Sequence, residues 1–370
     1  MYLYVIYLRS CGGALMAVRT LLKLGKSSLV VVLPKDWLRE VGLRSGDKVL
    51  VKQEEDGSLK IIPANMSLSD ETLRARVVVN LDKCGDEKLV QRLLVANYLI
   101  GNDTVTIISK KSVIPPHTLK SVREVISKLR GFEIIEQRPD LIVLQCMTDA
   151  TKFSMENLVG RLLALILSMV DYVKKAFDEG KMEYLKEIPF LEDELDRIYW
   201  FGVRQLLMVQ RNRALAKFVG IESALHIVGN RTILKVLELA GDYLEEIAKD
   251  LLRAQWEQLE KCEAFRKAIS NLVDQIEDII GDTLRAFNGL DIFLANEILE
   301  RVAQLEKQIH ENAEKILLGL SDVKTGGIIM KVFTRLVDMA KSLGVVCEVV
   351  INRSMEEPGR MARGCIYREV

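Results

Sequence analysis

The chain has 370 residues, with 52 Lys plus Arg against 52 Asp plus Glu. That length allows two or three domains with a sizeable core. Because the charges balance, the isoelectric point gives no indication of nucleic-acid binding. Only a local excess of basic residues could support such a function. The longest purely apolar run of the helical half, near Leu162–Ile166, is far shorter than the roughly 20 residues of a membrane span. We therefore expect no transmembrane segment.

The cysteines favour a reduced, cytoplasmic protein. They are widely spaced and form no CxxC pair: Cys11, Cys84, Cys146, Cys262, Cys347 and Cys365. Such spacing is typical of free thiols rather than of a disulfide framework. Residues Met1–Leu15 are apolar, but they lack the basic start and the cleavage site of a signal peptide. Translation starting at Met1 and translation starting at Met16 both stay open.

A small β-rich domain is predicted over residues 16–65. Strands are predicted at Leu29–Leu33, Lys48–Val51 and Leu59–Ile62, with turn residues between them. A short helix is predicted at Lys35–Val41, because Pro34 can open it and Gly42 can close it. A unit of this size cannot bury a core alone, so dimerisation through interleaved hairpins is expected.

Local charge in this domain favours DNA. From Arg19 to Lys52 there are eight Lys or Arg against three Asp or Glu. A two-fold dimer would double this excess into a basic surface, and Lys and Arg contacts to phosphate supply most non-specific DNA affinity. The alternative is that the domain only dimerises and its lysines are a solvated face.

Three motifs in this domain resemble the AbrB/SpoVT swapped-hairpin DNA-binding family. They are Gly25-Lys26-Ser27-Ser28, Leu33-Pro34-Lys35 and Gly42-Leu43-Arg44-Ser45-Gly46-Asp47-Lys48-Val49, and they occur in the family's order. The resemblance covers about Val18–Pro63. It implies that basic residues near the first strand and its loop face DNA: Arg19, Lys23 and Lys26, with Lys35 and Arg39 as further candidates.

Residues 70–150 are predicted to form a small α/β linker domain. Strands are expected at Ala75–Leu81, Thr104–Ser109, Glu133–Gln137 and Leu141–Gln145, and helices at Glu87–Tyr98 and Leu119–Leu129. The segment carries no glycine fingerprint and no nucleophile motif, so the sequence assigns it no function.

Residues 151–356 are predicted to be all-α, because apolar residues recur there at helical spacing, as in Leu158, Leu162, Leu165 and Met169. An internal repeat is visible within this part. Leu191–Asp196 aligns with Leu305–His310, Lys235–Asp242 with Lys331–Asp338, and Ala176-Phe177 with Ala286-Phe287. We expect two three-helix repeats at about 154–258 and 264–353.

Two acidic pairs in the first repeat predict a metal site. Glu192 and Asp196 lie four residues apart on one helix face, and so do Glu238 and Asp242. Four carboxylates converging from neighbouring helices would repel one another, and a multivalent cation would remove that cost. The alternative is that each pair belongs to a solvated helix face.

This arrangement resembles the PhoU family, whose two three-helix repeats carry acidic metal motifs. Glu238-Leu239-Ala240-Gly241-Asp242 matches the family's Glu-x-x-Gly-Asp signature, and the similarity covers about Ser154–Arg353. It implies a divalent or trivalent metal cofactor: iron, zinc, manganese, nickel or magnesium. Together with the N-terminal domain, the chain resembles an archaeal type of phosphate uptake regulator that fuses an AbrB-like domain to PhoU.

The second repeat departs from this pattern. Glu306 and Asp338 are kept, but His310 stands in the place of Asp196 and Thr334 in the place of Glu238. Imidazole is a good ligand for zinc, iron or nickel, so a second site with Glu306, His310 and Asp338 is predicted. His310 as an ordinary surface histidine is the alternative.

These features favour a DNA-binding regulator of phosphate homeostasis that forms a homodimer or a higher homo-oligomer. By resemblance, its partners would include components of the phosphate ABC transporter. The alternative is an adaptor that acts on the transporter signalling complex, with the N-terminal domain serving only to dimerise it. No catalytic constellation is present, and the three histidines His117, His226 and His310 lie in no nucleophile motif, so we expect no enzyme. A hydrolytic metal enzyme that uses the carboxylates is the minor alternative.

Overall fold

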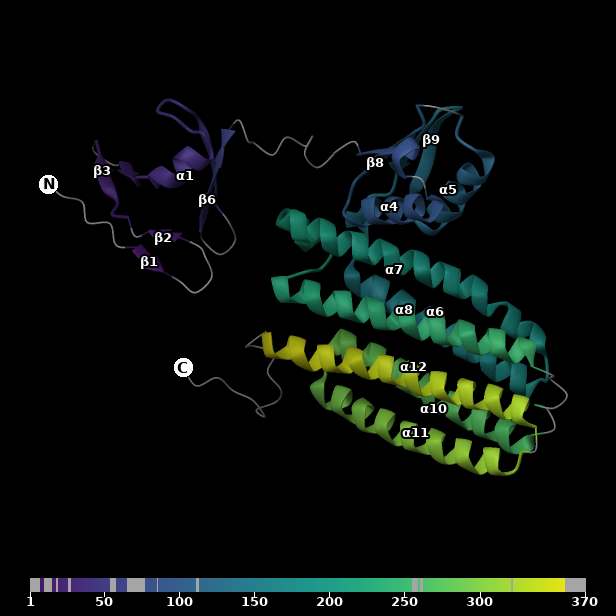
Figure 1. Ribbon diagram of the computed structural model, residues 1–370. Coiled ribbons are helices and arrows are strands. Elements are labelled where there is room, and N and C mark those ends of the chain that lie inside the picture. The colour runs from purple at the N-terminus through teal and green to yellow at the C-terminus, as the bar shows by residue number, and fades with distance from the viewer. Residues whose placement is uncertain are drawn as a thin grey trace. The chain divides into compact units, whose positions relative to one another are not determined.

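The computed structural model describes residues 7–9, 15–17, 19–25, 28–53, 58–64, 77–84, 86–110, 113–254, 259, 262–320 and 322–356. The chain divides into two compact units, Met1–Leu73 and Arg74–Val370. A small β unit, a mixed α/β sheet and a helical bundle are present, as predicted (Figure 1). In the part of the chain that the structure describes, no helix is both long and apolar enough to cross a membrane.

The first unit consists of short antiparallel hairpins and one helix. β1 (Tyr7–Arg9) pairs with β2 (Leu15–Ala17), β3 (Leu22–Leu24) with β4 (Ser28–Val30), and β5 (Val49–Gln53) with β6 (Leu59–Pro63). Helix α1 (Lys35–Glu40) follows β4, with Pro34 as its N-cap. Gly42, at a φ of 71°, takes the left-handed conformation just past the helix end. The predicted opening and closing of this helix are confirmed.

One strand of this unit was predicted with the wrong end, and another was not predicted. The strand expected at Leu29–Leu33 ends at Val30, because the chain must turn into a helix whose N-cap is Pro34, and a proline also restricts the residue before it. The strand Leu22–Leu24 was not predicted. It has three residues with Lys23 at its centre, too few for an alternation of apolar and polar residues to be visible.

The described residues of the first unit form almost no core. Among its described side chains only Pro63 is buried. Large apolar side chains are exposed on the β3–β4 and β5–β6 hairpins, including Leu24 at 63%, Leu29 at 62% and Leu59 at 64%. Exposed apolar surface on so small a unit indicates that it is completed by another surface.

The second unit begins with a four-stranded sheet. Its strand order is β7 (Val77–Asn80), β8 (Thr104–Ile108), β10 (Leu141–Cys146), β9 (Phe132–Arg138). β7 and β8 are parallel, and the other two pairings are antiparallel. Its helices are α3 (Leu81–Cys84), α4 (Glu87–Leu99) and α5 (Pro116–Lys128). The described residues of this module contain all four predicted strands and both predicted helices, and they add the short α3, which was not expected.

Six long helices form the bundle (Figure 1). They are α6 (Met155–Asp178), α7 (Ile188–Arg211), α8 (Ala224–Arg253), α10 (Glu263–Gly289), α11 (Ile292–Leu318) and α12 (Val323–Glu356). The first helices of the two repeats, α6 and α10, pack together, and so do the third helices, α8 and α12. Equivalent helices therefore meet at the centre, while α7 and α11 lie at the two outer sides.

The sheet module is attached to the bundle through α7, which contacts both α4 and α5. Arg204 of α7 is only 1% exposed. Its guanidinium donates to the Asp103 carboxylate at 2.6 Å and to the carbonyl of Tyr98. Leu99 and Trp200 pack against the cores of both the sheet module and the bundle. The α/β module is thus fixed on the outer helix of the first repeat.

Candidate functional site

The two acidic pairs of the first repeat lie on neighbouring helices. Glu192 and Asp196 belong to α7, and Glu238 and Asp242 belong to α8, which packs against it. Glu192 and Glu238 are each only 7% exposed. The i,i+4 spacing therefore places the glutamate of each pair inside the bundle. The aspartate of each pair lies one turn further along the helix and is partly accessible. These four residues are called the acidic cluster below.

Close approach allows the two helices to hold the acidic cluster together. Gly241 lies in α8 directly before Asp242, and a Cβ at that position would meet Leu195 Cδ1 at 2.8 Å. Leu195 lies in α7 directly before Asp196 and is fully buried. A glycine at this crossing permits the contact that brings the two pairs side by side.

Burial raises the pKa of all four carboxyl groups, and the charges of neighbouring acids add to each shift. Burial raises the pKa of Glu192 to about 8, and the charge of Asp196 adds to this shift. Burial is also the first cause of the raised pKa values of Asp196, Glu238 and Asp242. Asp196 acts on both carboxyl groups of the α8 pair. Glu192 thus keeps its proton at neutral pH, because its surroundings do not compensate the charge of a buried carboxylate.

Two lysines supply part of the missing positive charge. Lys128, in the last turn of α5, places Nζ 3.3 Å from Asp193 Oδ1 and 3.5 Å from Asp196 Oδ2. Lys235 of α8 forms an ion pair with Glu238 and lies 5.6 Å from the centre of the Tyr199 ring. The cluster is therefore contacted from the α/β module as well as from the bundle. Sequence reasoning missed Lys128, which is 68 residues from Asp196 along the chain.

The donor chemistry fits a metal ion, since buried carboxylates without full compensation are what a hard or borderline cation neutralises. The side-chain positions do not yet form a coordination sphere. Within the described ranges, no group of three or more His, Cys, Asp or Glu side chains is arranged to hold an ion. Lys128 and Lys235 contact the carboxylates instead, so a metal would have to draw these carboxylates inward from their lysine partners.

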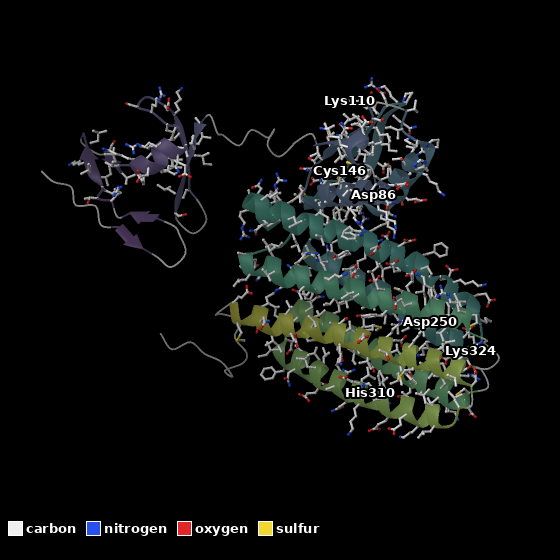
Figure 2. The ribbon with its side chains drawn as sticks, viewed as in Figure 1. Asp86, Lys110, Cys146, Asp250, His310 and Lys324 are labelled. Carbon is white, nitrogen blue, oxygen red and sulfur yellow. The ribbon has the colours of Figure 1, made fainter. Side chains whose placement is uncertain are left out.

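The second repeat brings two of its three candidate ligands together. His310 Nε2 lies 3.7 Å from Glu306 Oε1 on α11, and the imidazole is 68% exposed (Figure 2). Lys341 of α12 donates to Glu306 Oε1 at 2.6 Å, and this contact lowers the pKa of Glu306. Asp338 instead acts on Tyr243 of α8. Burial is the first cause of the raised pKa of this phenol, and the charge of Asp338 is the second. Thr334 is exposed and donates to the carbonyl of Met330. This site is more open than the first.

The basic residues predicted to face DNA are accessible where the structure describes them. Lys23 lies on β3, and Lys35 and Arg39 lie on α1, all three exposed. Arg39 is 3.9 Å from Asp36, with both side chains largely in solvent. Arg19, just before β3, is half-buried. Lys26 lies outside the described residues.

Two family models match separate parts of the chain. Residues 22–69 match the MazE family, described as antidote-toxin recognition MazE, a bacterial antitoxin. Residues 159–251 match the PhoU domain, and this range runs from the first turns of α6 to the end of α8. No curated protein matches the chain. Among solved structures, the chain is similar to the phosphate transport system regulatory protein PhoU from Streptococcus pneumoniae, at 17% identity and a TM-score of 0.46. That similarity covers 55% of this chain and 96% of the other.

Proposed function

Because this chain fuses a MazE/AbrB-like domain to a PhoU domain, we propose that it is a DNA-binding transcriptional regulator of phosphate uptake. The MazE-like part would bind operator DNA as a dimer, in the cytoplasm. The helical bundle would act as a metal-binding sensor. Both matched domains belong to regulatory families, and the proposal assigns the chain no catalytic role.

The observation that carries the DNA-binding proposal is the surface of the first unit. Its hairpins expose apolar side chains such as Leu24, Leu29 and Leu59, and the same unit exposes Lys23, Lys35 and Arg39. Pairing of two copies would cover apolar surface that a unit of this size cannot bury alone. It would also bring two sets of basic residues onto one duplex, as a symmetric operator requires.

The sensing part of the proposal rests on the acidic cluster. Glu192, Asp196, Glu238 and Asp242 would hold a divalent or trivalent cation, which would neutralise the repulsion that raises their pKa values. Binding would compete with Lys128 for Asp196. Because Lys128 belongs to the α/β module, metal binding would weaken one contact between that module and the bundle.

The DNA test uses the full chain, titrated onto fluorescent duplex DNA at two salt concentrations. We expect affinity to fall steeply with salt, by a slope of about 0.9 in log K per phosphate contact. The triple variant Arg19→Ala, Lys23→Ala, Lys26→Ala should bind more weakly on every sequence and show a flatter slope. A matched variant removes three exposed charges from the second unit: Lys120→Ala, Lys267→Ala, Lys331→Ala. Equal DNA affinity in the two triple variants would refute the assignment of this face.

The metal test is elemental analysis of the purified protein. Asp196→Asn and Asp242→Asn keep side-chain size, and each should sharply reduce metal content. Asp193→Asn is the matched control, since Asp193 contacts Lys128 but is largely exposed and lies outside the acidic cluster. Full metal occupancy in both cluster variants would show that the two pairs are ordinary helix faces.

The adaptor alternative has one observation in its favour. Leu225 and Val228 lie three residues apart in the first turns of α8 and are 61% and 66% exposed, so one face of the bundle offers apolar surface for docking. An adaptor would bind transporter components through the bundle and would show no DNA affinity. Absence of salt-dependent DNA binding, with retained binding to the transporter, would favour it.

A further inference from the structure

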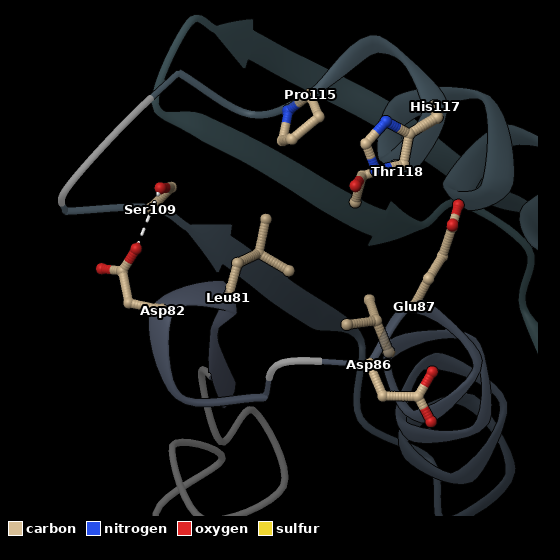
Figure 3. Close-up of a pocket in the computed structure, with 9 residues that line it drawn as sticks. Leu81, Asp82, Asp86, Glu87, Ser109, Pro115, His117 and Thr118 are labelled. Carbon is tan, nitrogen blue, oxygen red and sulfur yellow. Dashed lines mark hydrogen bonds between the residues drawn. The ribbon is translucent and has the colours of Figure 1, made fainter.

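A pocket in the α/β module lies at the carboxyl ends of the two parallel strands. Its volume is about 450 Å³. Leu81 and Asp82 follow β7 directly, and Ser109 follows β8. The first turns of α4 and α5 complete the lining (Figure 3). This edge of a parallel strand pair is where ligands of open α/β sheets bind, and the volume suits a small metabolite.

Two of the acidic side chains in the pocket already have structural partners. Asp82 accepts hydrogen bonds from Ser109 Oγ at 3.1 Å and from the backbone N–H of Lys110 at 2.7 Å. Asp86 is the N-cap of α4 and accepts from the N–H of Lys88 at 2.9 Å. Asp82 thus connects the ends of the two strands, and Asp86 caps the start of α4. They are therefore not counted among the groups available to a ligand.

The groups left for a ligand include the hydroxyl of a largely buried residue. Thr118 of α5 is only 8% exposed, and its hydroxyl has no hydrogen-bond partner among the residues that the structure describes. Figure 3 shows it facing the space that Leu81 and Glu87 border from the other sides. A hydroxyl that opens on a pocket and has no protein partner can donate a hydrogen bond to a bound ligand.

The start of α5 adds donors for an anion. Its N-cap is Pro115, which offers no side-chain acceptor, and Pro116 has no N–H. The N–H groups of His117 and Thr118 therefore begin the helix without an intrahelical partner. Together with the Thr118 hydroxyl they form a small anion-binding corner, favoured further by the helix dipole.

The pocket wall opposite the start of α5 carries a negative charge. Glu87 opens α4, is partly accessible, and keeps its carboxylate outside any hydrogen bond or ion pair found in the described chain. Figure 3 shows this carboxylate reaching toward the His117 side of the pocket. A multiply charged anion such as phosphate would be repelled here, whereas an ammonium group would be attracted. Leu81 and Val90 supply apolar surface between the two ends.

From this arrangement we infer that the pocket binds a zwitterionic α-amino acid with an apolar side chain. The ligand's carboxylate accepts from the first turn of α5 and the Thr118 hydroxyl. Its ammonium group faces Glu87, and its side chain packs on Leu81 and Val90. This inference concerns the α/β module and stands apart from the proposed regulator function.

Calorimetric titration of the full chain with L-leucine tests the inference. The wild-type chain should bind L-leucine and bind D-leucine much more weakly. Thr118→Val keeps the size of the side chain but removes the hydroxyl, and it should weaken binding about tenfold or more. Thr118→Ser restores the hydroxyl and should bind nearly as wild type. Glu87→Gln should weaken binding, while Glu133→Gln, an exposed acid on the far edge strand β9, should leave it unchanged.

Three results would overturn the inference. One is no heat of binding for L-leucine at millimolar concentration with the wild-type chain. Another is equal affinity of wild type, Thr118→Val and Glu87→Gln, because leucine would then bind elsewhere. The third is Thr118-dependent binding of inorganic phosphate that exceeds that of leucine, since the pocket would then prefer an anion to a zwitterion.

Discussion

Lys128 Nζ lies 3.5 Å from Asp196 Oδ2, so a lysine of the α/β module contacts an acidic cluster built by two helices of the bundle. The two attractions from Asp196 and Asp193 outweigh burial, and the pKa of Lys128 is raised. The lysine is thus held as an ammonium group where the predicted metal ion would place its charge. A protein cation and a metal cation would then be alternatives at one site.

Removing this lysine should favour the metal. Lys128→Met keeps the length of the side chain and removes its charge, and we expect Mn²⁺ affinity to rise about two- to fivefold, the range for a partly exposed ion pair. Lys120→Met, on the same helix and 80% exposed, is the control and should leave the affinity unchanged. Calorimetric titration with Mn²⁺ measures both. Weaker Mn²⁺ binding in Lys128→Met would show that the lysine supports the site rather than competing for it.

The metal-free protein should lose stability as the pH rises. The folded chain keeps a proton on Glu192 up to about pH 8, whereas the unfolded chain loses it near 4.5, the ordinary value. The folded state therefore binds more protons between these values, and the free energy of unfolding falls with pH across that window. Asp196, Glu238 and Asp242 have raised pKa values and act in the same direction.

Thermal unfolding in the presence of a chelator, from about pH 5 to about pH 8, tests this pH dependence. Glu192→Gln should flatten the decline, because glutamine does not ionise, whereas Glu133→Gln should leave it as in wild type. Added Mn²⁺ should reverse the trend, because deprotonated carboxylates bind the ion. Identical slopes in wild type and Glu192→Gln would mean that this carboxyl group ionises freely in the folded state.

The glycine at the crossing of α7 and α8 should be needed for stability. Gly241→Ala forces a Cβ against buried Leu195, and overpacking of this kind costs about 1–3 kcal/mol, more than alanine's gain in helix propensity of about 0.5–1 kcal/mol. Gly281 of α10 has nothing within 4 Å of the added Cβ, so Gly281→Ala should stabilise the chain. Denaturant unfolding of both variants checks the sign, and destabilisation by both would disprove this account of the close contact.

The two repeats should differ in their response to acid. The second site has Glu306 bonded to Lys341, an exposed His310, and Asp338 near Tyr243. An imidazole must lose its proton to bind a metal, so this site should lose its metal first as the pH is lowered. His310→Ala should abolish binding there, and Thr334→Glu should tighten it by adding a carboxylate. The number of Zn²⁺ ions bound per chain, measured for wild type and both variants at each pH, tests this prediction. Two sites of equal strength, unaffected by either change, would mean that the repeats are misaligned.

Local spacing made part of this site predictable. The i,i+4 separations fix which carboxylates share a helix face, and the repeat places them on the second and third helices, so the positions of Glu192 and Glu238 followed from the sequence. The contact of Lys128 did not follow, because it depends on how α5 docks on α7, and no periodicity within either segment encodes that docking. The pocket beside Thr118 was missed for a similar reason, since strand order decides which loops meet.

The first unit shows another limit of sequence patterns. Helix α1 was predicted from Pro34 and Gly42, which act through their own backbone conformations. Of the three-residue strands, β3 was not predicted and β4 was predicted too long, because so few residues show no alternation of buried and exposed side chains. In the proposed dimer, a second copy would supply the face that these strands lack.

Genome-wide mapping of DNA occupancy in the source cells, at high and at low phosphate, tests the central proposal most directly. The wild-type chain should occupy sites beside genes for phosphate uptake, and this occupancy should change with phosphate supply. The variant Arg19→Ala, Lys23→Ala, Lys26→Ala should lose these sites, while Lys120→Ala, Lys267→Ala, Lys331→Ala should keep them. Occupancy that is absent in wild type, or equal in the two variants at both phosphate levels, would contradict the proposal.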